Sequence, residues 1–234
     1  MEKGFEVMRK LLLVFMTVLA AGTFLSAGQA SAEENSSEVF VRAVHASPDA
    51  PAVDIYVNKD RILDNVNFKD VSDYLPLKEG RYAVKIYPAG ANPKKENPVI
   101  DKTFDLAAGQ VYTIAAVGPL NQIDLVAVGD QLEPVEGKAK IRAAHFSPDA
   151  PAVDIAAAPE TVLFENVSFP QVSDYLEAEP GTLDIEIRPA GSEDAVFQVP
   201  NVGLESGAVY TAFAVGLLEG EPGFDLILVK DQIQ

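Results

Sequence analysis

The sequence predicts an all-β protein: two tandem immunoglobulin-like β-sandwich domains that follow an N-terminal signal peptide. Three observations support this. The chain opens with a short apolar leader, it repeats itself with a period of about 100 residues, and each repeat consists of short runs in which apolar and polar residues alternate. Turn-forming Pro, Gly, Asn and Asp separate these runs, which is typical of strands joined by turns.

The leader has the three parts of a secretory signal. Lys3, Arg9 and Lys10 supply a basic start, residues 11–25 are apolar, and Ala30-Ser31-Ala32 has the small-residue pattern of a cleavage site. A membrane-spanning helix needs about 20 apolar residues, and this run is shorter. We therefore predict a signal peptide over residues 1–32, cleavage after Ala32 and no membrane span in the mature chain.

Composition restricts the cellular compartment and the classes of partner that we expect for this protein. The chain has no cysteine, so it forms no disulfide and carries no lipidated cysteine, which indicates an exported bacterial protein that depends on its core alone. Its formal net charge of −17 disfavours binding to nucleic acid. The charge is uneven: residues 36–131 hold 10 basic and 13 acidic side chains, whereas residues 138–234 hold 5 and 16.

The repeat defines the domains. Residues 41–55 match residues 141–155 at twelve of fifteen positions, and shorter matches follow at Val-Ser-Asp-Tyr-Leu and Pro-Ala-Gly. A period this long indicates tandem domains rather than a solenoid. We predict a first domain over 33–131, a linker over 132–137 and a second domain over 138–234.

Each domain is predicted to contain seven strands. In the first domain they are expected at 39–46, 52–58, 61–66, 81–87, 99–106, 110–117 and 122–128. The turns that lead to Tyr112 and Tyr210 resemble the tyrosine corner of immunoglobulin-like sandwiches, in which the hydroxyl bonds to backbone upstream. Seven strands in about 95 residues favour this fold class.

Together these motifs resemble a known family. Both copies of Arg-Ala-x-His-x-Ser-Pro-Asp-Ala-Pro-Ala-Val-Asp-Ile, each followed by Val-Ser-Asp-Tyr-Leu and Pro-Ala-Gly, are similar to the DUF4397 family. The resemblance covers residues 39–232. It implies an exported bacterial β-sandwich, and it brings no catalytic or ligand-binding residue with it.

The block that opens each repeat is the candidate site. The favoured interpretation is structural: a histidine at the end of an apolar strand face bonds to the loop that follows, which two prolines stiffen. The alternative is a small-ligand or metal site, in which an imidazole and carboxylates suit a transition metal. The loop residues are His45, Ser47, Asp49, Asp54, His145, Ser147, Asp149 and Asp154, and the metal candidates among them are His45, Asp49, His145 and Asp149.

Two ion pairs are also predicted from strand alternation. Arg42 points away from the apolar face of its strand, and so does Asp54 on the next strand. We expect Arg42 to pair with Asp54 across the strands, and Arg142 to pair with Asp154 in the second copy.

The predicted function is that of a secreted or cell-envelope-associated, non-catalytic structural or interaction protein with an extracellular or cell-wall partner. An enzyme is disfavoured because the block lacks a Gly-x-Ser-x-Gly elbow, and one strand-to-loop segment cannot easily aim His45, Ser47 and Asp49 at one another. We expect no cofactor. Lys94 and Lys95 form a basic loop tip that could support weak head-to-tail self-association with the acidic second repeat.

Overall fold

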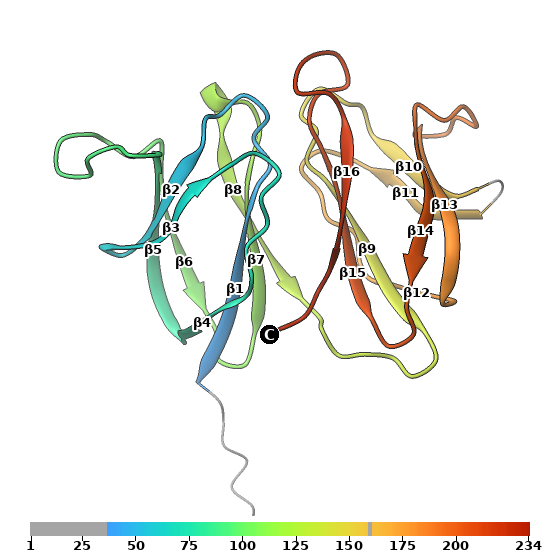
Figure 1. Cartoon of the computed structure of the whole chain (residues 1–234), viewed down its shortest axis with the longest axis horizontal. Helices are drawn as coiled ribbons and strands as arrows, with labels where there is room; N and C mark the ends of the chain where they lie inside the picture. The colour runs from blue at the N-terminus through green and yellow to red at the C-terminus, as the bar shows by residue number, and fades with distance from the viewer. Residues whose placement is uncertain (1–36, 159–160) are drawn as a thin grey trace, which may run out of the picture. The chain divides into compact units, whose positions relative to one another are not determined.

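The computed structural model describes residues 37–158 and 161–234, so the predicted signal peptide lies outside the described residues. Asn35–Gln234 form one compact unit. Within the described part the chain forms strands and a single 3-10 turn, and no helix there is long and apolar enough to cross a membrane (Figure 1). The all-β class and the tandem repeat are confirmed.

The first repeat contains eight strands and the 3-10 turn η1 (Leu120–Gln122). The strands are β1 (Glu38–His45), β2 (Val53–Val57), β3 (Asp60–Val66), β4 (Leu75–Lys78), β5 (Gly80–Pro88), β6 (Ile100–Leu106), β7 (Val111–Val117) and β8 (Asp124–Asp130).

The second repeat contains the same eight elements in the same order. They are β9 (Ala139–His145), β10 (Val153–Ala157), β11 (Thr161–Val167), β12 (Leu176–Ala178), β13 (Gly181–Pro189), β14 (Phe197–Leu204), β15 (Val209–Val215) and β16 (Asp225–Lys230).

Each repeat is a sandwich of two four-stranded sheets. In the first repeat one sheet has the order β4-β1-β7-β8 and the other has β3-β2-β5-β6, and the second repeat has the equivalent orders β12-β9-β15-β16 and β11-β10-β13-β14. The first strand runs parallel to the seventh, and the other pairings are antiparallel. The second and third strands lie in one sheet, whereas strands B and C of an immunoglobulin constant domain lie in different sheets. The likeness to immunoglobulins therefore concerns the sandwich architecture and not the strand order.

Alternation along the strands fills the space between the two sheets of each repeat. In the first repeat, Val53, Val84 and Ile86 from one sheet pack against Ile114 and Leu125 from the other. Such period-2 burial places every second side chain of a strand in the core. The second repeat has an equivalent core.

A third apolar cluster joins the repeats. The sheets that contain β1 and β9 turn their other faces to one another, so these sheets are buried on both sides. The cluster contains Val44, Ala46, Ala115 and Val117 from the first repeat and Ala144, Phe146, Phe213 and Val215 from the second. This packing explains why all seven residues of β9 and of β15 are buried.

The seven predicted strands all have counterparts, and β4 is the strand that sequence analysis did not predict. It is short and contains Pro76. Proline is tolerated in β4 because it is an edge strand, where one side of the backbone forms no ladder hydrogen bonds.

Candidate functional site

His45 and His145 are buried where the first strand of each repeat ends, each with only 1% of its surface exposed. Nε2 of His45 lies 3.2 Å from the carbonyl oxygen of Pro51, and Nε2 of His145 lies 3.0 Å from that of Pro151. A carbonyl only accepts hydrogen bonds, so Nε2 is the protonated nitrogen and donates. Nδ1 of each ring has no partner. Burial lowers the pKa of both histidines and keeps them neutral.

Ser47 and Asp49 are bonded to the loop that follows β7. The Ser47 hydroxyl is fully buried and donates to the carbonyl oxygen of Gly118 at 2.6 Å. Asp49 Oδ1 accepts the backbone N–H of Leu120 at 2.7 Å. Both side chains therefore tie the loop after β1 to the loop after β7.

The second repeat achieves the same closure with slightly different bonds. Asp149 accepts the backbone N–H groups of Leu218 and Glu219 at 2.8 and 2.9 Å, and Ser147 donates to Asp149 at 3.3 Å. Desolvation raises the pKa of Asp149, but these donors outweigh it and lower the pKa overall. The carboxylate is stabilised as an acceptor for the loop.

Asp54 holds together two turns of the sheet β3-β2-β5-β6. We call this sheet the outer sheet of the first repeat, because the other sheet packs against the second repeat, and the sheet β11-β10-β13-β14 is the outer sheet of the second repeat. It accepts the backbone N–H groups of Asn65 at 2.9 Å and Gly90 at 3.1 Å, and it pairs with Arg61 at 3.3 Å. Desolvation raises the pKa of Asp54, yet these donors lower it overall. The second repeat forms the same backbone bonds between Asp154 and the N–H groups of Asn166 and Gly191, at 2.7 and 2.8 Å.

The predicted ion pairs Arg42–Asp54 and Arg142–Asp154 are wrong. Each arginine lies on the sheet that faces the other repeat, and each aspartate lies on the opposite sheet of its sandwich. Both side chains point away from the core of their own repeat, so they point in opposite directions. Alternation identified the polar face of each strand correctly but could not show that the two strands belong to different sheets.

The structure does not bring the metal candidates together. His45, Asp49 and Asp54 each bond to a different backbone segment, as described above. Among residues 37–158 and 161–234, no three His, Asp or Glu side chains are grouped so that they could hold a metal ion. The contacts of these side chains are therefore those of residues that hold neighbouring loops in place.

The arginines instead form a reciprocal pair of contacts between the repeats. Arg42 of the first repeat places Nη1 at 2.7 Å from Oδ1 of Asp231 in the second. Arg142 of the second repeat pairs through Nη2 with Asp130 of the first. The side chains of all four are at most 2% exposed. We call Arg42, Asp130, Arg142 and Asp231 the crossed ion pairs.

Threonine and tyrosine hydroxyls orient the crossed ion pairs. Thr113 donates to Asp130 and Thr211 donates to Asp231, each at 2.6 Å. The same threonines accept Nε–H of the arginine in their own repeat, at 2.8 and 3.0 Å. Tyr74 donates to Asp130 at 2.7 Å and Tyr175 to Asp231 at 3.4 Å. Each carboxylate thus accepts hydrogen bonds from hydroxyl groups of its own repeat, and the arginine of the other repeat balances its charge.

The tyrosine rings also cover the arginines. The Arg42 guanidinium lies 4.9 Å from the ring centroid of Tyr74, and that of Arg142 lies 4.7 Å from the ring of Tyr175. Burial raises the pKa of both tyrosine hydroxyls, so they stay protonated and can donate to the carboxylates. Burial also raises the pKa of Asp231, and Arg42 opposes that shift.

The two proposed tyrosine corners differ from one another. The hydroxyl of Tyr210 accepts the backbone N–H of Glu205, five residues upstream, at 3.1 Å. Among the described residues, the Tyr112 hydroxyl has no hydrogen bond. The turn itself is shared, because Gly109 and Gly207 both adopt positive φ there.

Sequence analysis did not identify the crossed ion pairs, although a signal was present. Thr113, Tyr74 and Asp130 recur as Thr211, Tyr175 and Asp231, and Arg42 recurs as Arg142. These are polar residues that stay identical while most of the surface changes. Their recurrence indicated a shared role, but only the packing of the repeats shows which residues meet.

Comparison with solved structures finds distant similarities, of which we report two. Among solved structures, the C-terminal domain of AlgF from P. aeruginosa is 21% identical, with 41% of this chain and 100% of that chain covered and a TM-score of 0.32. A structure described as a cell adhesion protein from Bacteroides fragilis is 11% identical, with 84% and 98% covered and a TM-score of 0.21. Both similarities are too weak to imply a shared function.

A search of the curated proteins gives no significant match. The model of the family described as "Domain of unknown function (DUF4397)" matches residues 39–156 and 157–234. These matches span most of the chain, and the chain therefore belongs to the DUF4397 family.

Proposed function

We propose that this protein works outside the cytoplasm, in or on the cell envelope, as a non-catalytic interaction module. The observation that carries the proposal is the pair of crossed ion pairs, set beside the apolar cluster between the repeats. Together they join the two sandwiches into one unit, so the two outer sheets are held in a fixed relation. The leader supports export.

The polar residues that the repeats share serve the fold. The histidine loops and the crossed ion pairs are bonded within the chain, as described above, and this leaves few of these groups for chemistry on a substrate. The outer sheets, in contrast, differ between the repeats. Binding that depends on such surfaces is the function that this arrangement supports best.

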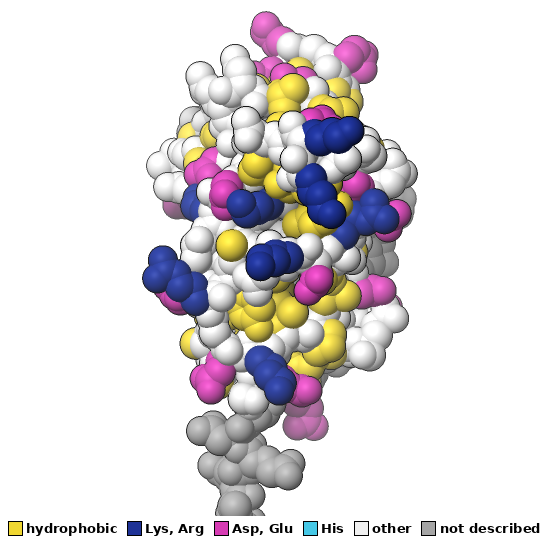
Figure 2. Space-filling view, turned by 90° about the vertical axis from the view of Figure 1, so that its left-hand side faces the viewer, with side chains coloured by type: hydrophobic (Ala, Val, Ile, Leu, Met, Phe, Trp, Pro, Cys, Tyr) yellow, Lys and Arg dark blue, Asp and Glu magenta, His cyan; other side chains and the backbone are white. Residues whose placement is uncertain are grey.

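The first outer sheet is the better candidate for the binding face. Figure 2 views the side of the molecule that carries β2, β3, β5 and β6, and basic side chains lie across it between apolar patches. Residues 53–66 and 80–106 contain seven basic residues: Lys59, Arg61, Arg81, Lys85, Lys94, Lys95 and Lys102. The equivalent segments of the second repeat, 153–167 and 181–204, contain only Arg188.

Three of these cations are available to a partner. Arg61, Arg81, Lys85 and Lys102 form ion pairs with nearby aspartates. Among the described residues, Lys59, Lys94 and Lys95 form none. Lys94 and Lys95 lie in the exposed loop between β5 and β6. We propose that this loop contacts an anionic component of the envelope, and such contacts weaken as salt screens them.

The proposal is tested by sedimenting the purified protein with envelopes isolated from the bacterium that encodes it. We expect the wild-type protein to sediment, and Lys94→Glu/Lys95→Glu to sediment much less. The matched control is Glu193→Lys/Asp194→Lys, which reverses charge in the corresponding loop of the second repeat and should not weaken binding. Circular dichroism verifies that both variants are folded.

Two results would contradict the proposal. The first is recovery of the expressed full-length protein in the cytoplasm alone, because the leader should direct export. The second is envelope binding that the Lys94→Glu/Lys95→Glu variant retains at every salt concentration.

A further inference from the structure

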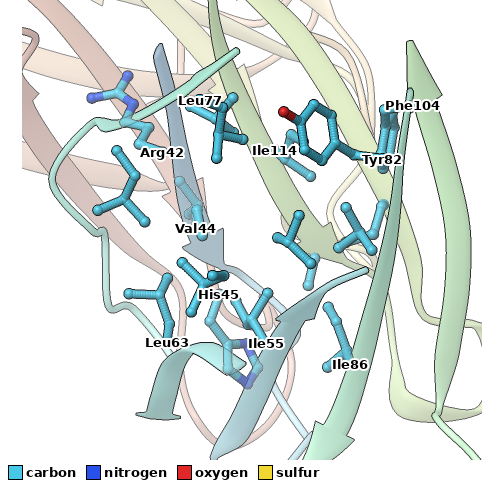
Figure 3. Close-up of a pocket in the computed structure, with 18 of the residues that line it drawn as sticks. Arg42, Val44, His45, Ile55, Leu63, Leu77, Tyr82, Ile86, Phe104 and Ile114 are labelled. Carbon is cyan, nitrogen blue, oxygen red and sulfur yellow. The ribbon is translucent and has the colours of Figure 1, made fainter. Parts of the chain in front are cut away.

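The first sandwich contains an apolar cavity between its two sheets. Its volume is about 60 Å³, and side chains from both sheets line it. Figure 3 shows Ile55, Ile86 and Phe104 on one side and Leu77 and Ile114 on the other. Almost all of the lining is apolar. Of the polar groups at its border, Arg42 belongs to the crossed ion pairs and His45 Nε2 is bonded to the loop, whereas His45 Nδ1 has no partner.

The cavity opens toward the edge formed by β3 and β4. Ile62 on β3 is 40% exposed, and Leu75 and Leu77 on β4 are half-buried. At the far end, Ile86 and Leu125 are only 1% and 3% exposed. The opposite edge of the sandwich is closed, because Lys102 on β6 donates to the carbonyl oxygen of Leu125 on β8 at 2.8 Å. We call this cavity the slot; its most exposed lining residue, Ile62, lies on the side of β3 and β4.

The second repeat has a larger side chain at one position equivalent to a residue that lines the cavity. Leu63 pairs with Ile55 in the first repeat, and Phe164 takes this place opposite Ile155 in the second. The first repeat has its own rings at Tyr82 and Phe104, which line the slot (Figure 3).

We propose that this slot binds the end of an alkyl chain, supplied by a free single-chain amphiphile such as a fatty acid. The lining is almost entirely apolar, and the unpaired Nδ1 of His45 is a single polar atom among about twenty lining residues, so the cavity favours an aliphatic ligand over a polar one. A cavity of about 150 Å³ accepts benzene and stays dry. A cavity of 60 Å³ fits a narrower group, and its open end leaves a polar head in water.

The probe for the test is sodium octanoate, followed by methyl NMR of the Ile, Leu and Val side chains. We expect saturable shifts of methyl groups that line the slot, with smaller or no shifts in the core of the second repeat. Leu63→Phe copies the residue found at Phe164, so the variant should fold, and it should weaken binding at least about tenfold, equivalent to about 1.4 kcal/mol. The matched control is Val162→Phe, which adds the same ring at a 40% exposed site on β11 and should leave binding unchanged.

Three results would overturn the proposal. One is the absence of saturable shifts in the wild-type protein, because the slot would then be a packing gap only. Another is octanoate binding that Leu63→Phe does not weaken. The third is binding to phosphatidylglycerol vesicles without binding to octanoate, which would assign the slot to a bilayer lipid and not to a free amphiphile.

Discussion

The crossed ion pairs make a strong prediction about stability. Asp231→Asn removes one carboxylate charge from a site where both side chains are at most 2% exposed. The buried site then holds two arginines and one carboxylate, Asp130, whose Oδ2 lies 4.0 Å from Nε of Arg42 and which also pairs with Arg142. Removing one member of a buried ion pair costs about 3–5 kcal/mol in free energy of unfolding, because the remaining charge is buried without compensation. We therefore expect Asp231→Asn to destabilise the whole Asn35–Gln234 unit by an amount in this range.

Removing both charges of the Arg42–Asp231 pair should lower the free energy of unfolding much less than the sum of the two single substitutions. Replacing a buried ion pair with apolar residues of similar volume is often close to neutral. The variant Arg42→Met/Asp231→Leu should therefore be more stable than the sum of its single variants predicts. The expected signature in a double-mutant cycle is a coupling free energy of several kcal/mol, where an exposed pair gives about 0–1 kcal/mol.

The assay is urea unfolding monitored by circular dichroism, since the chain has no tryptophan to report by fluorescence. The matched control is Asp225→Asn. Asp225 pairs with Lys69 across the same repeat interface at 2.8 Å, but its side chain is 46% exposed. This control should change the free energy of unfolding by no more than about 1 kcal/mol. A loss below about 1 kcal/mol for Asp231→Asn, or strict additivity in the cycle, would refute the argument.

Three further predictions follow from other parts of the structure. Burial lowers the pKa of His45 and His145 below the unfolded value of about 6.5, so the unfolded state binds more protons below that pH. The free energy of unfolding should be highest above about pH 6.5 and should decrease as the pH falls below that value. A urea midpoint that stays constant from about pH 7.5 to pH 5.5 would contradict this. Leu63→Phe should stabilise the first repeat by up to about 1.4 kcal/mol if the ring fills the 60 Å³ cavity, as thermal unfolding can measure; a loss would mean that the site is already overpacked. Asp54→Ala should cost about 1–3 kcal/mol because two backbone N–H groups lose their acceptor. Hydrogen exchange should then accelerate at the amides of Asn65 and Gly90. Unchanged exchange would contradict the role of Asp54 as their acceptor.

Local patterns predicted the strands well. Alternation and turn residues placed seven strands per repeat, because half-buried strands follow a period of two. They did not predict β4, in which Pro76 weakens the strand pattern. The histidine at the end of β1 was also interpretable locally, since its partner Pro51 lies only six residues away.

Self-similarity and alternation along the chain are enough to identify the repeat, the all-β class and the polar strand faces that carry Arg42 and Asp54. The partner of Arg42 becomes visible only when the two repeats are packed together, because Asp231 lies 189 positions further along the chain, in the other repeat. A strand pattern reports which face a side chain occupies and carries no information about what covers that face. The partner depends on which sheets pack together, and the apolar cluster between the repeats sets that packing.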